Sequence, residues 1–224
     1  SNLLEAIYFL SSGKSFRSSS SGQLIKWGEK ISSVRAKITD NQGESEVEVQ
    51  LWRENTGALK RRFLIDKVVK TRAKYWGKVK IVVFEPEDLR LINGSPGRRR
   101  DFLDGIFANT EWRYASALSQ YHKALKNRNE LLDIIAGGKA QKSELFYWDQ
   151  SLIKNADIIQ TFRLNWVKSA NLFFSEHQDQ EISKLSINYQ ASIINEEKLK
   201  QWYPLELAAG YTKCGPHLDD FSIN

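Results

Sequence analysis

The sequence contains very little cysteine: Cys214 is the single one among 224 residues. One cysteine excludes an internal disulfide framework and is typical of a reducing cytoplasm. Long apolar runs are also missing, since none approaches the roughly 18–20 residues that span a bilayer, and no signal peptide is visible. These absences predict a soluble, cytoplasmic protein.

Groups that hold metals or attack substrates are sparse as well. The three histidines are far apart in the sequence and show no paired-ligand spacing. Neither Ser15 nor Cys214 lies in a nucleophile motif. A metal-dependent nuclease is therefore a weak hypothesis, and the sequence assigns no catalytic residue.

Apolar, aromatic and basic residues are abundant. Hydrophobic residues make up 41% of the chain, which includes seven Trp, eight Tyr and eleven Phe, so we expect a folded core. The 33 Lys and Arg exceed the 27 Asp and Glu, and the net charge of +6 favours a polyanionic partner.

The most informative motif lies between residues 82 and 104. Its order indicates a buried strand, a proline turn, a Gly/Pro loop and then three consecutive arginines, at 98–100, at the start of a helix. The free N–H groups and the dipole of a helix N-terminus favour phosphate, and three guanidinium groups would strengthen such a site. Two other interpretations stay open: a solvated basic turn, or arginines that Asp101 and Asp104 neutralise internally.

This segment resembles the RecF family of bacterial recombination-repair ATPases, in which a strand ending in Phe-x-Pro-Glu-Asp-Leu leads through a Gly-x-Pro loop to Arg-Arg and Phe-Leu-Asp. Residues 2–17 are similar to the helix that follows the family's phosphate-binding loop and to its basic Gly-Lys-Ser-Phe-Arg turn. Residues 210–221 are similar to the family's Gly-Pro-His-x-Asp-Asp segment. Leu218 departs from this pattern, because a basic residue is common there, so the resemblance carries no phosphate contact to that position.

The resemblance also defines what this sequence lacks relative to the family. The phosphate-binding loop Gly-x-x-x-x-Gly-Lys-Ser/Thr is absent apart from Ser1, which is either its last residue, a Mg²⁺ ligand through the hydroxyl, or a remnant of cloning. The signature motif and the acidic ATPase strand are absent after Asn224. We therefore expect weak ATPase activity in the full-length protein, and little ATP binding or hydrolysis by this chain.

The resemblance and the charge pattern together define the candidate site residues. In the similar SMC ATPases an arginine of the first loop lies near nucleotide and DNA, so Arg17 is assigned to both, and Ser1 to nucleotide. Basic residues also cluster between 60 and 80, and three cations at 123–128 are expected to face solvent. The candidate DNA-binding residues are Lys14, Arg17, Arg61, Arg62, Arg98, Arg99, Arg100, Lys123, Lys126 and Arg128.

Hydrophobic periodicity predicts the secondary structure around these motifs. Gly137-Gly138 is expected to end the second of three helices and Ser143 to cap the third. The predicted helices cover residues 2–10, 102–135 and 143–173. The predicted strands, with a hairpin turn at 40–43, cover residues 31–38, 44–51, 63–65, 79–84 and 184–191.

We predict an α/β fold: a partial ABC/SMC-type P-loop NTPase lobe with a mixed β-sheet, plus an inserted helical second lobe. The expected domains are the first lobe at 1–97, the helical lobe at 98–200 and a return to the first lobe at 201–224. The aromatic stripe of the helices is interpreted as core, because its spacing follows helical periodicity.

The resemblance implies an ATP-dependent protein of DNA replication, recombination, repair and the SOS response, with ATP and Mg²⁺ as cofactors. Such a protein would bind duplex DNA near single-strand gaps, form an ATP-dependent homodimer and help to load recombinase with RecR and RecO. The alternative is a helical protein-interaction module without a nucleic-acid role. Cations gathered on one face would favour DNA binding, whereas scattered cations would favour the module.

Overall fold

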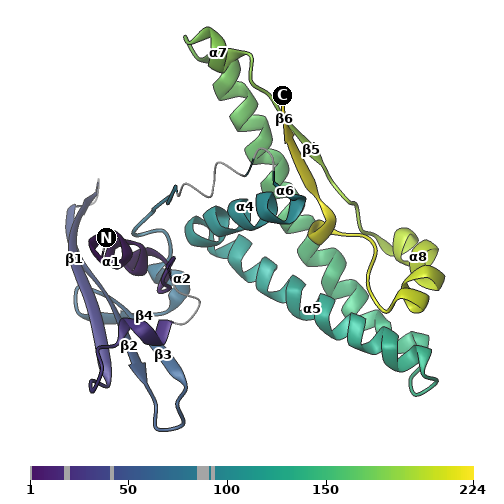
Figure 1. Cartoon of the computed structure of the whole chain (residues 1–224), viewed down its shortest axis with the longest axis horizontal. Helices are drawn as coiled ribbons and strands as arrows, with labels where there is room; N and C mark the ends of the chain where they lie inside the picture. The colour runs from purple at the N-terminus through teal and green to yellow at the C-terminus, as the bar shows by residue number, and fades with distance from the viewer. Residues whose placement is uncertain (1, 18–20, 41–42, 85–90, 92–93) are drawn as a thin grey trace. The chain divides into compact units, whose positions relative to one another are not determined.

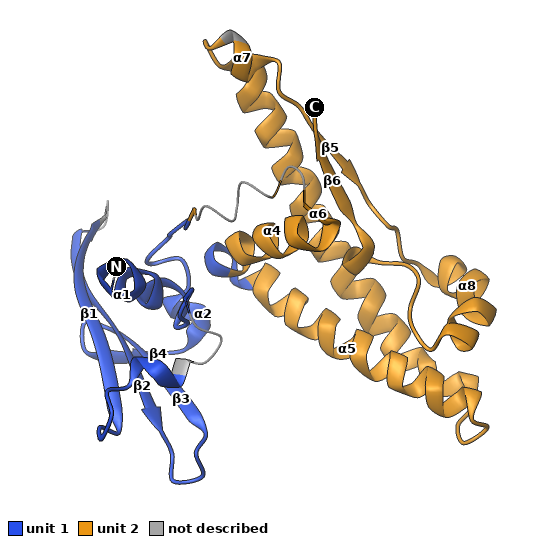
Figure 2. Ribbon diagram, viewed as in Figure 1, with its two compact units in different colours: residues 1–83, 109–112 blue, residues 84–108, 113–224 orange. Residues whose placement is uncertain are grey.

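The chain divides into two compact units (Figure 2). Figure 1 shows the computed structural model, which describes residues 2–17, 21–40, 43–84, 91 and 94–224. Unit 1 comprises residues 1–83 and 109–112, and unit 2 comprises residues 84–108 and 113–224. This division differs from the expected domains, because residues 201–224 pack within unit 2. Among the described residues, none of the helices combines the length and the apolarity required to cross a membrane.

Unit 1 contains a four-stranded sheet and short helices. Its elements in chain order are α1 (Asn2–Ser12), η1 (Ser21–Leu24), β1 (Ile31–Asp40), β2 (Gly43–Arg53), β3 (Leu59–Ile65), β4 (Val68–Lys70) and α2 (Arg72–Tyr75). The strands lie in the order β1-β2-β3-β4, and every neighbouring pair is antiparallel. The predicted hairpin is confirmed, with Ile31 opposite Trp52. In the described residues the sheet is antiparallel rather than mixed, because its connections are too short for a parallel crossover.

The core of unit 1 lies between α1 and one face of the sheet. Alternate residues of β2 point into this core and are fully buried: Val47, Val49 and Leu51. Phe9 and Leu10 of α1 belong to the same cluster. The hydroxyl of Tyr75 donates a hydrogen bond to the carbonyl of Leu10 at 2.8 Å. These contacts fix the end of α1, and with it the basic turn that follows, against the sheet.

Two expectations for the first 84 residues differ from the structure. The apolar stripe predicted on α1 is only partly buried, since Leu3 and Leu4 are exposed. Residues 79–84 form no strand, although one was predicted, and both Val82 and Phe84 are exposed. An apolar run becomes a strand only where a neighbour pairs with it, and none of the described strands does so here.

The second half of the chain is mainly helical (Figure 1). Its elements are α4 (Pro96–Thr110), α5 (Trp112–Ala136), η3 (Lys142–Leu145), α6 (Phe146–Glu176), α7 (Gln180–Ser183), β5 (Ile187–Gln190), α8 (Glu196–Ala209), η4 (Pro216–Leu218) and β6 (Asp220–Ile223). β5 and β6 form a two-stranded antiparallel sheet, and β5 packs on α6. The helix predicted at 102–135 is two helices that meet at Glu111. Both bury their apolar residues in one core, so the periodicity continues through the junction and conceals it.

The ends of the long helices follow local chemistry. α5 ends where Gly138 takes φ +73°, a left-handed conformation that glycine adopts readily, so the predicted stop is confirmed. Ser143 does not cap α6, because the chain has already become helical at η3. Gln141 caps η3, and its backbone N–H donates to Oε1 of Glu144 at 2.8 Å. This capping box starts the helical path that α6 continues.

The core of unit 2 combines the apolar stripes of three helices with the C-terminal strand. The residues with no exposed surface include Tyr114, Tyr121, Leu132, Leu152 and Ile159. Trp166 is half-buried, with its ring 6.2 Å from that of Phe107 and 6.5 Å from that of Phe221. The interpretation of the aromatic stripe as core is therefore confirmed at these positions.

Candidate nucleic-acid interface

A glycine holds the basic turn after α1 against β3. Gly13 adopts φ +68°, and its N–H donates to the carbonyl of Phe9 at 2.8 Å, which ends the helix. A Cβ at this position would lie 2.9 Å from the ring of Phe63 and 3.3 Å from Cδ of Arg61. Because only glycine fits both this conformation and this space, the turn can bring Lys14 beside the cations of unit 1.

Lys14, Arg61 and Arg72 form a group of like charges, here called the cation cluster. Burial lowers the pKa of Lys14, and repulsion by Arg72 and then Arg61 lowers it further. The pKa of Arg72 is lowered by burial and then by Arg61. An anion bound among these three side chains would relieve their repulsion. Arg72 is a site residue that the sequence reasoning missed, and its signal was its place in the basic stretch 60–80.

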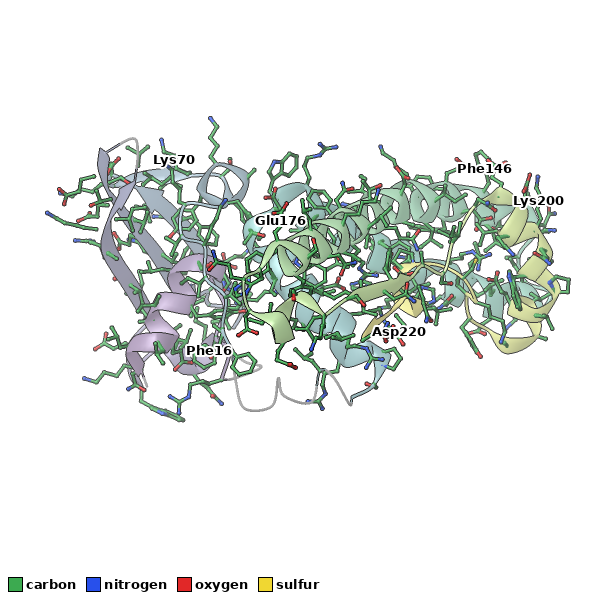
Figure 3. The ribbon with its side chains drawn as sticks, turned by 90° about the horizontal axis from the view of Figure 1, so that it is seen from above. Phe16, Lys70, Phe146, Glu176, Lys200 and Asp220 are labelled. Carbon is green, nitrogen blue, oxygen red and sulfur yellow. The ribbon has the colours of Figure 1, made fainter. Side chains whose placement is uncertain are left out.

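Adjacent arginines of β3 point to opposite faces of the sheet. Side chains alternate along a strand, so Arg61 faces the side of α1 and Arg62 faces away from it. There the guanidinium carbon of Arg62 lies 5.2 Å from the centre of the Trp52 ring, in a cation–π arrangement. Figure 3 labels Lys70, the last residue of β4. The basic stretch 60–80 therefore covers more than one face, and only part of it joins the cation cluster.

Arg17 lies beside the beginning of α1. Its Nη1 is 3.3 Å from Oδ1 of Asn2 and 3.7 Å from Oε2 of Glu5. The hydroxyl of Ser15 donates to the same carboxylate, so the turn folds back onto the first helical turn. The side chain of Arg17 is 52% exposed and remains within reach of an anion. Ser1, the other candidate for nucleotide and Mg²⁺, lies outside the described residues.

The three arginines at the start of α4 have different surroundings. Ser95 caps the helix, since its Oγ lies 3.4 Å from the backbone nitrogen of Arg98. The side chain of Arg98 is exposed, and no ion pair joins it to another of the described residues. Arg99 and Arg100 are partly exposed and donate hydrogen bonds within unit 2. Of the predicted phosphate-binding triplet, Arg98 is the one that faces solvent.

The carboxylate that neutralises Arg99 comes from the C-terminal end of the chain. Arg99 forms a bidentate ion pair with Asp220, with Nε to Oδ1 at 2.9 Å and Nη2 to Oδ2 at 3.0 Å. Internal neutralisation by Asp101 and Asp104 is not observed, because Asp101 is exposed and Asp104 pairs with Arg163 at 2.7 Å. The idea of an internal partner is correct for Arg99, but no local pattern could reveal a partner so distant in sequence.

The cations of α5 also divide into exposed and buried residues. Lys123 and Lys126 are exposed, as expected. Arg128 is 1% exposed, so the expectation that it faces solvent is wrong. Tyr121 and Leu132, which are fully buried, lie seven residues before and four after it, on the same helical stripe. This spacing was a signal in the sequence that Arg128 belongs to the core.

Arg128 is the centre of a buried ion-pair network. Its Nε lies 2.7 Å from Oδ1 of Asp149, and its Nη2 lies 2.7 Å from Oε2 of Glu206. Its Nη1 donates to Oγ1 of Thr212 at 2.8 Å. Burial raises the pKa of Asp149, and the attraction of Arg128 only partly offsets this shift. One arginine thus joins α5, α6, α8 and the segment after α8.

A second buried arginine holds the Gly-Pro-His-x-Asp-Asp segment. Nη1 of Arg163 donates to Oδ2 of Asp219 at 2.7 Å and to the carbonyl of Pro216 at 2.8 Å. Its Nη2 donates to Oδ1 of Asp104 at 2.7 Å. The carboxylate of Asp219 also accepts hydrogen bonds from Gln160, Tyr189 and Ser192. The motif that carried the family resemblance therefore has a structural role in unit 2, which the sequence reasoning missed.

His217 of the same segment is held neutral. Its Nε2 lies 3.1 Å from the carbonyl of Thr212, which can only accept, so Nε2 carries the proton. Its Nδ1 then accepts from the hydroxyl of Tyr121 at 2.7 Å. Burial lowers the pKa of His217 and stabilises this neutral form. In the part of the chain that the structure describes, no group of three or more His, Cys, Asp or Glu could hold a metal ion.

The fold has counterparts among solved structures, although no family model matches the sequence. One structure, described as the recombination mediator protein RecF-ATPrS in the RecFOR pathway, is 30% identical with a TM-score of 0.84. Another, described as RecF-ATP in the same pathway, is 31% identical with a TM-score of 0.79. Both matches cover 100% of this chain and 63% of the solved chain. The fold class is thus α/β, as predicted, and the chain shares its fold with these RecF structures.

Curated relatives identify one family within that class. The DNA replication and repair protein RecF of Leptospira interrogans serogroup Icterohaemorrhagiae serovar Lai is 34% identical over 99% of this chain and 62% of its own length. The protein of the same name from Thermoanaerobacter sp. is 32% identical over 100% of this chain and 64% of its own length. The chain belongs to the RecF family, and it spans about 62–64% of the length of these relatives.

Proposed function

We propose that this protein is an ATP-dependent DNA-binding protein of recombinational repair, which binds duplex DNA near single-strand gaps. The observation that carries the proposal is the cation cluster, in which Lys14, Arg61 and Arg72 repel one another. DNA supplies a regular row of phosphates, and contacts with phosphates provide much of the affinity of DNA-binding proteins. The net charge of +6 acts in the same direction over longer distances.

Unit 2 has candidate DNA-binding cations of its own. Arg98 is exposed at the start of α4, where the helix dipole also favours phosphate. Lys123 and Lys126 are exposed on α5, although Lys126 lies 3.7 Å from Glu130. Arg99 and Arg100 support the fold around Arg98, and Arg128 is excluded from the interface because it is buried.

The beginning of α1 fits a nucleotide phosphate. Asn2 and Glu5 hold Arg17 beside the N-terminus of this helix, where the dipole favours negative charge. We assign ATP to this end of the helix, with the hydroxyl of Ser1 as the proposed Mg²⁺ ligand. When bound, ATP would supply the phosphate charge that links two copies of the protein, and the full-length protein would hydrolyse it slowly. The part of Arg17 is to bind and orient a phosphate.

The proposed partners follow from the pathway in which the similar structures are placed. Two RecF structures are described as belonging to the RecFOR pathway. We therefore propose that this protein works with RecO and RecR, forms an ATP-dependent homodimer and helps to load recombinase on gapped DNA. DNA replication, recombination and the SOS response are the proposed cellular settings, in the cytoplasm.

Charge reversal in the cation cluster tests the proposal. Lys14→Glu combined with Arg72→Glu should weaken binding to a fluorescent gapped duplex, measured by anisotropy over a series of salt concentrations. The slope of log affinity against log salt should fall by about 0.9 for each phosphate contact that is lost.

The matched control makes the same change in net charge at two exposed residues of α6, Lys154→Glu combined with Lys168→Glu. An equal loss in the control would mean that net charge alone attracts DNA. A double variant that keeps its melting temperature, its DNA affinity and its salt slope would contradict the proposal. That outcome would favour the alternative, a helical protein-interaction module.

A further inference from the structure

The three neighbouring arginines at the start of α4 lie in the same unfavourable electrostatic field but have different partners. The positive end of the helix dipole repels cations there. Arg99 and Arg100 are relieved of this repulsion by groups of the C-terminal segment, whereas Arg98 is exposed. The three arginines therefore do not share one role, and the contacts of Arg99 show how the roles divide.

The guanidinium of Arg99 joins three parts of unit 2. Its Nε and Nη2 hold the two carboxylate oxygens of Asp220 at 2.9 Å and 3.0 Å. Its Nη1 donates to the carbonyl of Gly94 at 2.8 Å and to that of Leu91 at 3.3 Å, both of which precede α4. Four of the five N–H groups of a guanidinium are thus engaged within the protein.

The position of Asp220, the partner of Arg99, is fixed by the contacts of the residues around it. It begins β6 and pairs with Gln190 of β5. Its neighbour Asp219 is fully buried against Arg163, at 2.7 Å. Figure 3 marks Asp220 where β6 begins. A carboxylate anchored on both sides fixes the position of Arg99 and, through it, the first turn of α4.

We propose that Arg99 and Asp220 are positioning residues for the DNA contact of Arg98. The pair holds the first turn of α4 through Arg99, and Arg99 also binds the carbonyls of Gly94 and Leu91. Arg98 is thereby kept at a fixed place on the surface before DNA arrives, and a preorganised contact loses less entropy on binding. This inference rests on the proposed DNA-binding function.

In the alternative interpretation, Asp220 weakens DNA binding instead of supporting it. Arg99 would itself bind a DNA phosphate, and that phosphate would have to displace the carboxylate of Asp220. The geometry favours positioning, because the side chains of Arg99 and Asp220 are only 16% and 31% exposed. A phosphate in place of Asp220 would also leave that carboxylate without its cation, next to the carboxylate of Asp219.

The experiment compares Asp220→Asn, which keeps the shape and removes the charge, with Arg98→Gln. Asp220→Asn should weaken binding to a gapped duplex several-fold with an unchanged salt slope, because no phosphate contact is lost. In the free protein, the amide hydrogens of Arg98 and Arg99 should exchange faster. Arg98→Gln should instead lower the salt slope by about 0.9 and leave amide exchange unchanged.

Arg99→Lys is the second variant, since lysine keeps the charge and loses the bidentate grip. It should reproduce the effects of Asp220→Asn. Tighter binding or a steeper salt slope in Asp220→Asn would overturn the inference in favour of competition, and unchanged amide exchange would overturn it as well. If Arg98→Gln leaves the salt slope unchanged, Arg98 does not contact DNA phosphate. The positioning role of Arg99 and Asp220 is then refuted as well, because it depends on that contact. If only Asp220→Asn has no effect, the DNA function stands and the positioning role falls.

Discussion

The two units use arginine in opposite ways. In unit 2, Arg128 and Arg163 are each 1% exposed, and each pairs with two carboxylates. In unit 1, Arg61 and Arg72 lie with Lys14 in a cluster of like charges. An arginine buried among carboxylates joins helices and is closed to ligands, whereas cations that repel one another favour an external anion. The same residue type therefore indicates a scaffold or a binding site according to its neighbours.

Removing a scaffold arginine should have the largest effect. Arg163→Met should lower the free energy of unfolding by about 3–5 kcal/mol, because it leaves the buried carboxylates of Asp104 and Asp219 without a cation. Urea denaturation followed by tryptophan fluorescence measures the change. The matched control, Lys168→Met on the exposed side of α6, should change stability by less than about 0.5 kcal/mol. A variant as stable as the parent would show that this network does not hold the C-terminal segment.

Neutralising a cation of the cluster should have a smaller effect. It should change the pKa of a neighbouring cation and the DNA affinity, rather than the free energy of unfolding. Arg72→Gln should raise the pKa of Lys14, because one source of repulsion is removed. Burial, the larger cause, stays, so the pKa of Lys14 should remain below its ordinary value of 10.5. The salt slope of DNA binding should fall by about 0.9 for the lost contact. NMR titration of the lysine side chains and anisotropy measure the two effects.

The sign of the pH dependence follows from the same shift. Because its pKa is lowered, Lys14 loses its charge at a lower pH than an ordinary lysine does. DNA affinity should therefore fall as pH rises through the pKa of Lys14, and Arg72→Gln should move this fall to higher pH. Arg62→Gln, on the other face of the sheet, is the control and should leave the titration of Lys14 in place. If Arg62→Gln shifts the pKa of Lys14 as much as Arg72→Gln does, the two faces of the sheet do not differ in their effect on Lys14.

The smallest predicted effect concerns His217. Its pKa is lowered from 6.5 by burial, so the unfolded chain takes up a proton more readily than the folded protein does. The stability that neutral His217 contributes is complete above about pH 6.5 and is lost as pH falls through its lowered pKa. His217→Gln should flatten the decline of the melting temperature between neutral and acidic pH. His177→Gln, at the C-terminal end of α6, is the control and should leave that decline unchanged. An unflattened curve in His217→Gln would refute the assignment.

Local patterns predicted the elements that depend on neighbours in sequence. The hairpin of β1 and β2 and the end of α5 at Gly138 follow from alternation and from glycine, and both are observed. The strand predicted at 79–84 is absent because strand formation depends on a partner, which periodicity does not report. The break at Glu111 is invisible for a related reason, since α4 and α5 share one core.

The sequence predicted most of the residues of the candidate site, but not which of them lie close together. The basic turn containing Lys14 and the basic stretch containing Arg61 were both found, but their convergence depends on the close approach of Gly13 to β3. The surroundings of Arg99 depend on Asp220, which is 121 residues away. Contacts of this kind arise from the tertiary fold, so one sequence without its structure cannot separate Arg98 from Arg99.

The network of Asp104, Arg163 and Asp219 sets an order of events during synthesis. The ribosome makes α4, α5 and α6 before Asp219, which lies between η4 and β6. Until Asp219 leaves the exit tunnel, burial of Arg163 would enclose a charge that lacks one of its two carboxylates, which is costly. The strands of the first sheet all lie within residues 31–70 and emerge early. A translational pause between residues 164 and 219 therefore prolongs the time for which the aromatic stripe of the helices is open to chaperones.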